Sequence, residues 1–342
     1  DAHSARIVNS LRVGLRSLLS RVTGPGWLTG ALVLGLVLIG EAALGQLGSD
    51  WRSHTPMREA RALAVSSDAV WGGTSGGLFR RDRETGSIER YTTVEGLSGI
   101  DVQALALDAD RSHLWIGYPD GSLDRLDVDT GSVTAVRAIA RADRYSDRSV
   151  HVLAVEGDSL LVGTGFGVVV VDVESAQVRD SYVRFGPSGR SVIVRDLAVG
   201  ATGGSEKLRL WLATTDGLAH ASLSHPNLRD PGAWTVESVP GAGGPLRALA
   251  LHEGDVFVGA PNGGFVRRDD GFERVWGSVD EVRDLVSTPE GLIGVFRFAL
   301  RRAVRDDRIR VGERSNLQAL VAAPNGRYWV ADEDRGIAGF DE

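Results

Sequence analysis

A short phrase recurs seven times along this chain and constrains the fold more than any other feature. Each copy is a polar residue followed by Ala, Asp or Val, then Leu, then Ala or Val, and the seven polar lead residues are Arg61, Gln103, His151, Arg195, Arg247, Arg283 and Gln318. Successive lead residues are 42, 48, 44, 52, 36 and 35 positions apart. A unit that repeats about every 43 residues is typical of a β-propeller blade.

A second element follows each phrase, a strand rich in aromatic and aliphatic residues that ends at a small residue and turns on glycine. Val70-Trp-Gly-Gly73 precedes Gly76-Gly77, and Leu114-Trp-Ile-Gly117 precedes Asp120-Gly121. Alternating β-branched and aromatic residues favour a half-buried strand, and glycine supplies the positive φ of a tight hairpin. Two further strand-like runs complete each repeat. We therefore predict an all-β fold, a seven-bladed β-propeller of four-stranded antiparallel blades over residues 51–342.

The two ends of the repeat region predict how the ring closes. The last copy stops after its third strand, and Trp51–Thr55 precedes the first copy and resembles the outer strand Trp234–Glu237. Pairing Trp51–Thr55 with the strand that contains Ile337–Phe340 completes the seventh blade and leaves no exposed strand edge there.

The sixth repeat departs most from the pattern. Leu292-Ile-Gly294 leads directly into Phe296-Arg-Phe298 with no glycine turn. Five arginines follow between residues 301 and 310. We expect this to be the least regular blade.

Residues 1–45 lie outside the repeats and have the layout of a secretory signal peptide. Four arginines (Arg6, Arg12, Arg16 and Arg21) precede an apolar run from Trp27 to Ile39, and Ala43-Leu-Gly45 offers small residues for cleavage before Gln46. An uncleaved membrane segment is the alternative, since residues 27–44 are barely long enough to span a bilayer and include Glu41.

Composition excludes several classes of function. The chain has no cysteine, which removes disulfides, thiol nucleophiles and cysteine metal clusters. The formal net charge is -7, and because residues 1–45 carry four Arg against Asp1 and Glu41 (+2), the remainder carries −9. Such an acidic body argues against nonspecific nucleic-acid binding.

Three strings resemble catalytic or ligand motifs without their structural context. Ser75 lies in a nucleophile-elbow pattern and Gly163–Gly167 imitates a dinucleotide loop, but in both a strand follows where a helix is required. Asp127–Gly131 has only the start of a calcium loop. The histidines lack the paired spacing of metal ligands. We predict no catalytic residue, metal or cofactor, and no enzymatic activity.

The lead column is the candidate ligand site. Arg61, Gln103, His151, Arg195, Arg247, Arg283 and Gln318 occupy equivalent places at the start of each innermost strand, so they are predicted to circle the mouth of the central channel. Four arginines with a histidine and two amides would form a collar that attracts anions. The alternative is structural, with each arginine bonded to a loop of the neighbouring blade.

Several phrases also resemble a known family. Tyr91–Ser98 (YTTVEGLS), Thr164–Val169 (TGFGVV) and Thr215–Leu218 (TDGL) are similar to the N-terminal propeller of the PorZ family, a cell-surface component of the type IX secretion system, and individual blades resemble the propellers of two-component regulators. The resemblance covers about residues 51–342. It implies a non-enzymatic protein that works with a PorU-like sortase and with anionic lipopolysaccharide attached to cargo. In this family a second propeller and a sorting domain follow, and the chain ends before either.

These observations leave three function classes. The leading one is an exported interaction and glycan-binding module of the secretion machinery at the outer membrane surface or in the periplasm. The second is the ligand-sensing ectodomain of a two-component regulator. The third, an enzyme with a metal in the channel, would need several carboxylates or histidines aimed at the axis, and the lead column is mainly cationic.

Overall fold

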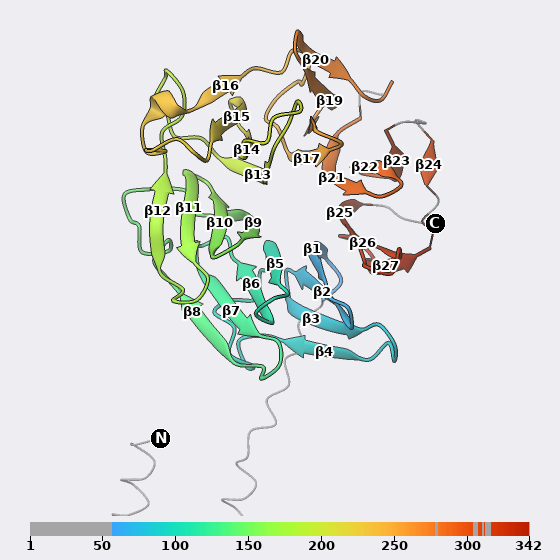
Figure 1. Cartoon of the computed structure of the whole chain (residues 1–342). Helices are drawn as coiled ribbons and strands as arrows, with labels where there is room; N and C mark the ends of the chain where they lie inside the picture. Colours follow the sequence, from blue (N-terminus) through green and yellow to red (C-terminus); the bar gives the residue numbers. More distant parts are fainter. Residues whose placement is uncertain (1–56, 278–279, 304–306, 310, 312–315, 342) are drawn as a thin grey trace, which may run out of the picture. The chain divides into compact units, whose positions relative to one another are not determined.

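The computed structural model describes residues 57–277, 280–303, 307–309, 311 and 316–341. Within them, 27 strands form seven antiparallel sheets, each a meander whose strands pair in chain order. The sheets stand side by side around a centre, with the first strand of each sheet innermost (Figure 1). The predicted seven-bladed propeller is confirmed.

Strand boundaries follow the predicted units closely. The first three blades are β1 (Ala60–Val65), β2 (Ala69–Thr74), β3 (Gly77–Asp82) and β4 (Ile88–Tyr91); β5 (Ala104–Asp108), β6 (His113–Gly117), β7 (Leu123–Asp127) and β8 (Val133–Val136); and β9 (Val150–Glu156), β10 (Ser159–Thr164), β11 (Gly167–Asp172) and β12 (Val178–Tyr182). The fourth and fifth are β13 (Val194–Gly200), β14 (Arg209–Thr214), β15 (Gly217–Ser222) and β16 (Thr235–Glu237), and β17 (Ala248–His252), β18 (Asp255–Ala260), β19 (Gly263–Arg268) and β20 (Gly271–Arg274). A 3-10 turn at Pro231–Ala233 precedes β16.

The last two blades are less complete. The sixth is β21 (Val282–Thr288), β22 (Gly291–Phe296), β23 (Ala299–Arg302) and β24 (Arg308–Ile309), and the seventh is β25 (Leu317–Ala322), β26 (Tyr328–Asp332) and β27 (Gly336–Phe340). The predicted closing strand Trp51–Thr55 lies outside the described residues, as does the predicted signal peptide. Both remain predictions. No helix in the described part of the chain is long and apolar enough to cross a membrane.

The hydrophobic core is divided among the gaps between blades. Seven clusters of buried apolar residues are present in the described residues, and each joins two neighbouring sheets. The seventh cluster packs Ala60, Leu63 and Val70 of the first blade against Trp329 and Ala331 of the last. Burial of apolar area therefore closes the ring at this seam as it does between every other pair of blades.

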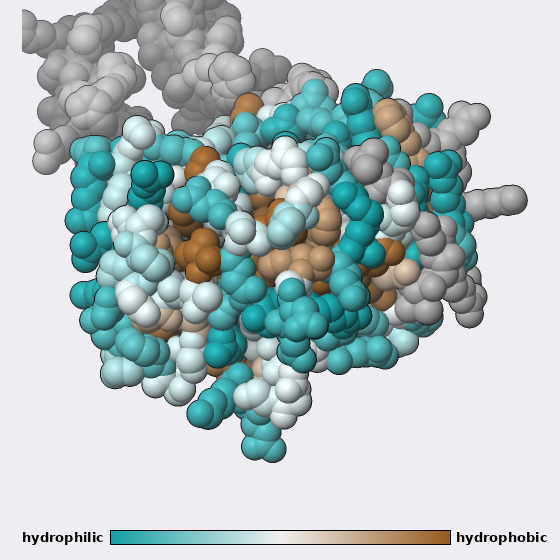
Figure 2. Space-filling model, turned by 90° about the horizontal axis from the view of Figure 1, so that it is seen from above, coloured by the Kyte–Doolittle hydropathy of each residue, from teal (hydrophilic) through white to brown (hydrophobic). Residues whose placement is uncertain are grey.

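In the first two blades, the glycine at or next to the end of the second strand has a packing cause. A Cβ atom on Gly73 would lie 2.5 Å from Val102 Cγ1, and one on Gly117 would lie 2.5 Å from Val150 Cγ1. Val102 and Val150 each lead into the inner strand of the following blade and are fully buried. A side chain at these glycines would force adjacent blades apart. Apolar side chains thus lie mainly between sheets, and the side of the ring in Figure 2 is largely hydrophilic with small apolar patches.

The sixth blade shows the irregularity expected from its sequence. Its β22–β23 hairpin turns through Arg297 and Phe298 without glycine, since Phe296 pairs with Ala299. Its outer strand β24 has two residues, and Phe298 is 66% exposed at the turn. The outer edge of this blade therefore has few strand-to-strand hydrogen bonds among its described residues, and its backbone is poorly protected from local opening.

Candidate functional site

The lead residues reach the channel mouth through a backbone feature that recurs around the ring. In β1, Ala60 pairs with Thr74 and Ala62 with Gly73, which leaves Arg61 as the extra residue of a β-bulge. The same register shift leaves out the lead residues of four other inner strands, His151, Arg195, Arg283 and Gln318. A bulge redirects the side chain that it carries. The bulges therefore give these five residues equivalent orientations that the strand period alone would not provide.

Backbone hydrogen bonds between neighbouring blades fix where each inner strand begins relative to the preceding blade. The backbone N–H of Val150 donates to Tyr118 O at 3.1 Å, and that of Leu246 donates to Thr214 O at 3.1 Å. Each acceptor lies at or beside the end of the second strand of the preceding blade. The start of an inner strand and the preceding hairpin therefore share one face of the ring.

Five of the seven lead residues line one pocket of about 390 Å³ at this face. They are His151, Arg195, Arg247, Arg283 and Gln318, and Glu281 completes the wall. Three of the four arginines that were predicted to converge are among them. Arg61 and Gln103, the lead residues of the first two blades, do not line this pocket. We use "collar" below for the five lead residues and Glu281.

Glu281 neutralises one side of the collar. Its Oε1 lies 2.6 Å from Arg247 Nε and its Oε2 lies 3.2 Å from Arg283 Nε. Arg283 also donates to Asn316 Oδ1 at 2.6 Å and to Leu317 O at 3.1 Å in the next blade. Arg283 therefore links the sixth and seventh blades, as expected if the lead arginines bond to a loop of the neighbouring blade.

The opposite side of the collar keeps its positive charge. Arg195 forms no ion pair with a described residue, and its buried Nε has no hydrogen-bond partner there. Burial and the charge of Arg247 lower the pKa of Arg195, while Asp147 acts in the other direction. Burial and the charge of Arg195 likewise lower the pKa of His151, whose Nε2 is also buried without a partner among these residues. An anion beside Arg195 would relieve both effects.

Arg61 has local carboxylate partners. It pairs with Glu59 at 3.3 Å, with Asp101 of the second blade at 2.9 Å and with Glu333 of the seventh at 3.5 Å. Glu333 also accepts from Gln318 at 2.7 Å. Acidic residues therefore neutralise the part of the predicted anion-attracting collar that lies near the first and last blades.

The sequence contains a signal for some of these acids that the lead column alone does not show. Glu59, Asp101 and Glu281 each lie two residues before a lead residue, and Asn316 holds the same place before Gln318. These four residues therefore lie at the rim of the channel, two positions before the lead residue. Together with the lead column, these residues indicate that Arg61 and Arg283 are neutralised and that Arg195, whose counterpart is Ile193, has no acid at this place. They do not indicate the neutralisation of Arg247, whose counterpart is Pro245 and whose partner Glu281 belongs to the next blade.

Two buried carboxyl groups lie directly after lead residues on the inner strands. Asp196 accepts hydrogen bonds from Leu197 N at 2.8 Å and from Leu249 N of the next blade at 2.7 Å. Asp284 accepts from Leu285 N at 2.8 Å and from Leu320 N at 2.9 Å. Burial, with the charge of Asp284, raises the pKa of Asp196 to about 8, and burial raises that of Asp284. The inner strands form the innermost edge of each sheet, where no further strand pairs with their backbone N–H groups. The carboxyl groups of Asp196 and Asp284 accept hydrogen bonds from these N–H groups instead.

The remaining motifs have ordinary structural roles in the described residues. Ser75 lies in the β2–β3 hairpin, and its hydroxyl donates a hydrogen bond to Glu59 at 2.7 Å. In the Gly163–Gly167 string, Thr164 closes the β10–β11 hairpin by donating to Gly167 O at 2.8 Å. Asp127 caps a turn by accepting from Asp129 N and Thr130 N. Among residues with described positions, no group of three or more His, Asp or Glu could hold a metal ion.

Comparison with known proteins supports the resemblance seen in the sequence. Residues 70–235 match the family model for the N-terminal β-propeller domain of PorZ from the type IX secretion system. PorZ of Porphyromonas gingivalis, described as an essential surface component of that system, has a similar structure with a TM-score of 0.68 and 20% identity over 85% of this chain and 38% of PorZ. The predicted resemblance to this family is confirmed, and the low identity to the solved structure shows the fold alone.

Other propellers have comparable similarity. The extracellular domain of a hybrid two-component system, BT3049 of B. thetaiotaomicron, has a TM-score of 0.66 and 14% identity over 83% of this chain and 40% of that one. The WD40 propeller of Doa1 has a TM-score of 0.64 and 12% identity over 85% of this chain and 96% of that one. The chain thus spans about two fifths of the PorZ and BT3049 structures. No curated protein matches it in sequence.

Proposed function

We propose that this chain is an exported, non-enzymatic binding module of a type IX secretion system, and that its collar binds the anionic groups of a surface glycan. The family match over residues 70–235 supports the secretion role. By resemblance, the partners are a PorU-like sortase and anionic lipopolysaccharide on cargo. The single observation that carries glycan binding is Arg195, a guanidinium without a carboxylate partner among the described residues, in a pocket shared with Arg247 and His151.

The chemistry of the collar suits a sulfate, phosphate or carboxylate group. Guanidinium groups donate forked hydrogen bonds to such anions, and each charge-assisted bond contributes about 1.5–3 kcal/mol. Arg247 is 43% exposed on its side chain and lines the same pocket as Arg195, so a ligand beside Arg195 can also contact Arg247.

Calorimetry with a matched pair of polymers tests this site. The protein is titrated with dextran sulfate and with uncharged dextran at 50 and 300 mM salt. We expect salt-sensitive binding of dextran sulfate only, and at least tenfold weaker binding by the Arg195→Gln/Arg247→Gln variant. A control variant, Arg90→Gln/Arg179→Gln, removes the same charge from outer strands. Equal losses in the two variants would mean that binding follows net charge and not the collar.

The second candidate function, a sensor ectodomain, draws support from the similarity to BT3049. Deletion of the gene separates the two. Loss of surface attachment of type IX cargo, restored by the wild-type gene, supports the secretion role. A deletion that leaves cargo attached but abolishes a transcriptional response to a glycan supports the sensor.

A further inference from the structure

Exposed arginines surround the side of the collar that keeps its positive charge. They lie in two connections: residues 137–149, between β8 and β9, lead to His151, and residues 183–193, between β12 and β13, lead to Arg195. We call these the third-blade and the fourth-blade connection. Each of the sheets that they join is a four-stranded meander, so its last strand ends at the face where the next inner strand begins. Both connections therefore cross the collar face, from the outer edge of one blade to the channel mouth of the next.

Formal charge is distributed unevenly over the connections of this face. The third-blade connection holds four arginines against Asp143 and Asp147, and the fourth-blade connection holds two arginines and no acid, so each carries +2. The corresponding connections before the second and sixth blades, residues 92–103 and 275–281, each hold two acids and no base, so each carries −2. The positive connections are the two that lead to the side of the collar where Arg195 lies.

Five of the six arginines in these connections are available to a ligand. One, Arg148, pairs with Asp143 at 2.9 Å, and Asp147 accepts a hydrogen bond from Ser149 N of its own connection at 3.0 Å. The other five are exposed and have no ion-pair partner among the described residues, and we call them the basic sector: Arg137, Arg141, Arg144, Arg184 and Arg190. Guanidinium groups without a local acid can pair with an external anion.

Apolar contacts hold the third-blade connection in place. Ile139 is buried in the core cluster between the second and third blades. The Tyr145 ring stacks on Phe166 of the β10–β11 hairpin with ring centres 3.9 Å apart, and the guanidinium of Arg144 lies 4.8 Å from the Tyr145 ring. The backbone that carries these arginines is therefore already ordered, so a ligand does not have to order it on binding.

The fourth-blade connection is anchored in the same way. Phe185 is 1% exposed and makes an edge contact with Trp234, with ring centres 4.8 Å apart. The backbone N–H of Phe185 donates to Arg190 O at 3.1 Å and forms a small β-bridge. Arg184 directly precedes this anchor and Arg190 pairs with it, so both arginines of the connection are held beside a buried side chain.

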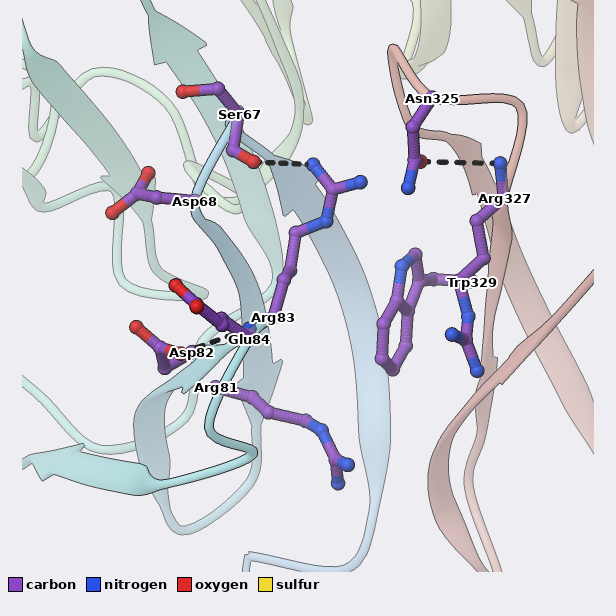
Figure 3. Close-up of a pocket in the computed structure, with 9 residues that line it drawn as sticks. All are labelled: Ser67, Asp68, Arg81, Asp82, Arg83, Glu84, Asn325, Arg327 and Trp329. Atoms are coloured by element: carbon purple, nitrogen blue, oxygen red, sulfur yellow. Dashed lines mark hydrogen bonds between the residues drawn. The ribbon is translucent and has the colours of Figure 1, made fainter.

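Another arginine-rich surface of the ring differs in its charge balance. The depression of about 450 Å³ between the first and seventh blades is lined by three arginines and three carboxylates (Figure 3). These residues are Arg81, Arg83, Arg327, Asp68, Asp82 and Glu84. Arg83 also donates to Ser66 O and Ser67 O at 2.9 and 2.7 Å. This depression therefore offers a polyanion no net positive charge, whereas the basic sector does.

We infer that the ligand of the collar face is a linear polyanion and not a single charged sugar, with one anionic group at Arg195 and the following groups on the basic sector. The inference rests on the proposed function of the collar. The outer strand of a blade lies three strand spacings, about 14 Å, from its inner strand, so a single sugar at Arg195 leaves the outer ends of both connections uncovered. An exposed arginine alone holds an anion weakly, because water and salt screen the charge. A chain with one group in the collar presents its next groups to the basic sector at a high effective concentration.

Calorimetry with dextran sulfate tests the basic sector apart from the collar. The variant Arg141→Gln/Arg190→Gln changes one arginine in each connection and is expected to melt at the wild-type temperature, because neither side chain has an ion-pair partner among the described residues. We expect it to bind dextran sulfate at least tenfold more weakly than the control Arg90→Gln/Arg179→Gln, which removes the same charge from outer strands. Its affinity should also depend less steeply on salt, because fewer counterions are released.

The collar variant Arg195→Gln/Arg247→Gln distinguishes the inference from the proposed function. If the collar variant binds weakly and the basic-sector variant binds like the control, the collar is correct and the inference is overturned. If the basic-sector variant binds weakly and the collar variant binds like the control, the collar is wrong, and so is a path that continues from it. If the wild type does not bind dextran sulfate, both are wrong.

Hydrogen exchange of the wild-type protein locates the ligand and tests its length. In the complex with dextran sulfate, residues 137–149 and 183–193 should exchange more slowly, whereas residues 92–103, the acidic connection at the equivalent place, should not change. Glucose 6-sulfate at the same sulfate concentration should leave both positive connections unchanged at their outer ends. Equal protection by this monomer would show that a single charged sugar is sufficient and would overturn the inference.

Discussion

The carboxyl group of Asp196 on β13 accepts a hydrogen bond from the backbone N–H of Leu249 on β17 at 2.7 Å. This bond joins the fourth blade to the fifth along the innermost edge of the ring. Asp284 makes the corresponding bond to Leu320, two blades further on. Because the inner edges face a channel and not another strand, side chains of the inner strands must satisfy them.

Asp196→Asn should change how stability depends on pH. The folded-state pKa of Asp196, about 8, is raised above its ordinary value of 3.8. The folded protein therefore binds this proton more tightly than the unfolded chain, and the associated stability is lost as pH rises from about 4 to 8. The variant should show a shallower fall in the unfolding free energy over this window, measured by urea denaturation. A fall as steep as that of the wild type would contradict the assignment.

Gly117→Ala should destabilise the ring, since the new Cβ would lie 2.5 Å from Val150 Cγ1. Overpacking of this kind costs about 1–3 kcal/mol. Val150→Ala removes the opposing methyl groups but leaves a cavity. In a double-mutant cycle by thermal and urea unfolding, the two changes together should cost less than the sum of the single costs. Simple additivity would show that the contact between these blades is not tight.

Truncation tests the predicted closing strand. A chain that starts at Gln46 keeps Trp51–Thr55, and one that starts at Met57 lacks it. We expect the second to unfold several degrees below the first, because β27 loses its partner. Equal melting temperatures would remove Trp51–Thr55 from the seventh blade.

Hydrogen exchange should be fastest in the sixth blade among the described sheets. Residues 288–312 contain a hairpin without glycine and the two-residue strand β24, whereas residues 101–127 form regular strands. Less outer pairing means a smaller free energy of local opening. Mass spectrometry of peptides after exchange should therefore show lower protection over 288–312. Comparable protection in the two regions would refute this.

Much of the ring could be predicted from the sequence because its causes are local. The repeated phrase at Arg61, Gln103 and their equivalents marked each inner strand, the strand-and-glycine pattern marked each hairpin, and the count of seven followed from the spacing. The weak sixth blade was visible as a missing glycine. Each of these features depends on residues within one repeat of about 43, so no long-range information was needed.

What only the tertiary structure decided is how charge is distributed around the ring. The bulges that orient the lead residues depend on register between strands, and the carboxylates of Glu281, Asp101 and Glu333 reach the arginines across blades. The sequence placed Arg195, Arg247 and Arg283 in one column, but whether each is neutralised depends on which acid the neighbouring blade brings within about 4 Å, where Coulomb attraction in a partly buried site becomes large. The contact of Arg81 with the Trp329 ring has the same origin, since the two residues lie 248 positions apart and meet only when the first and last blades pack together.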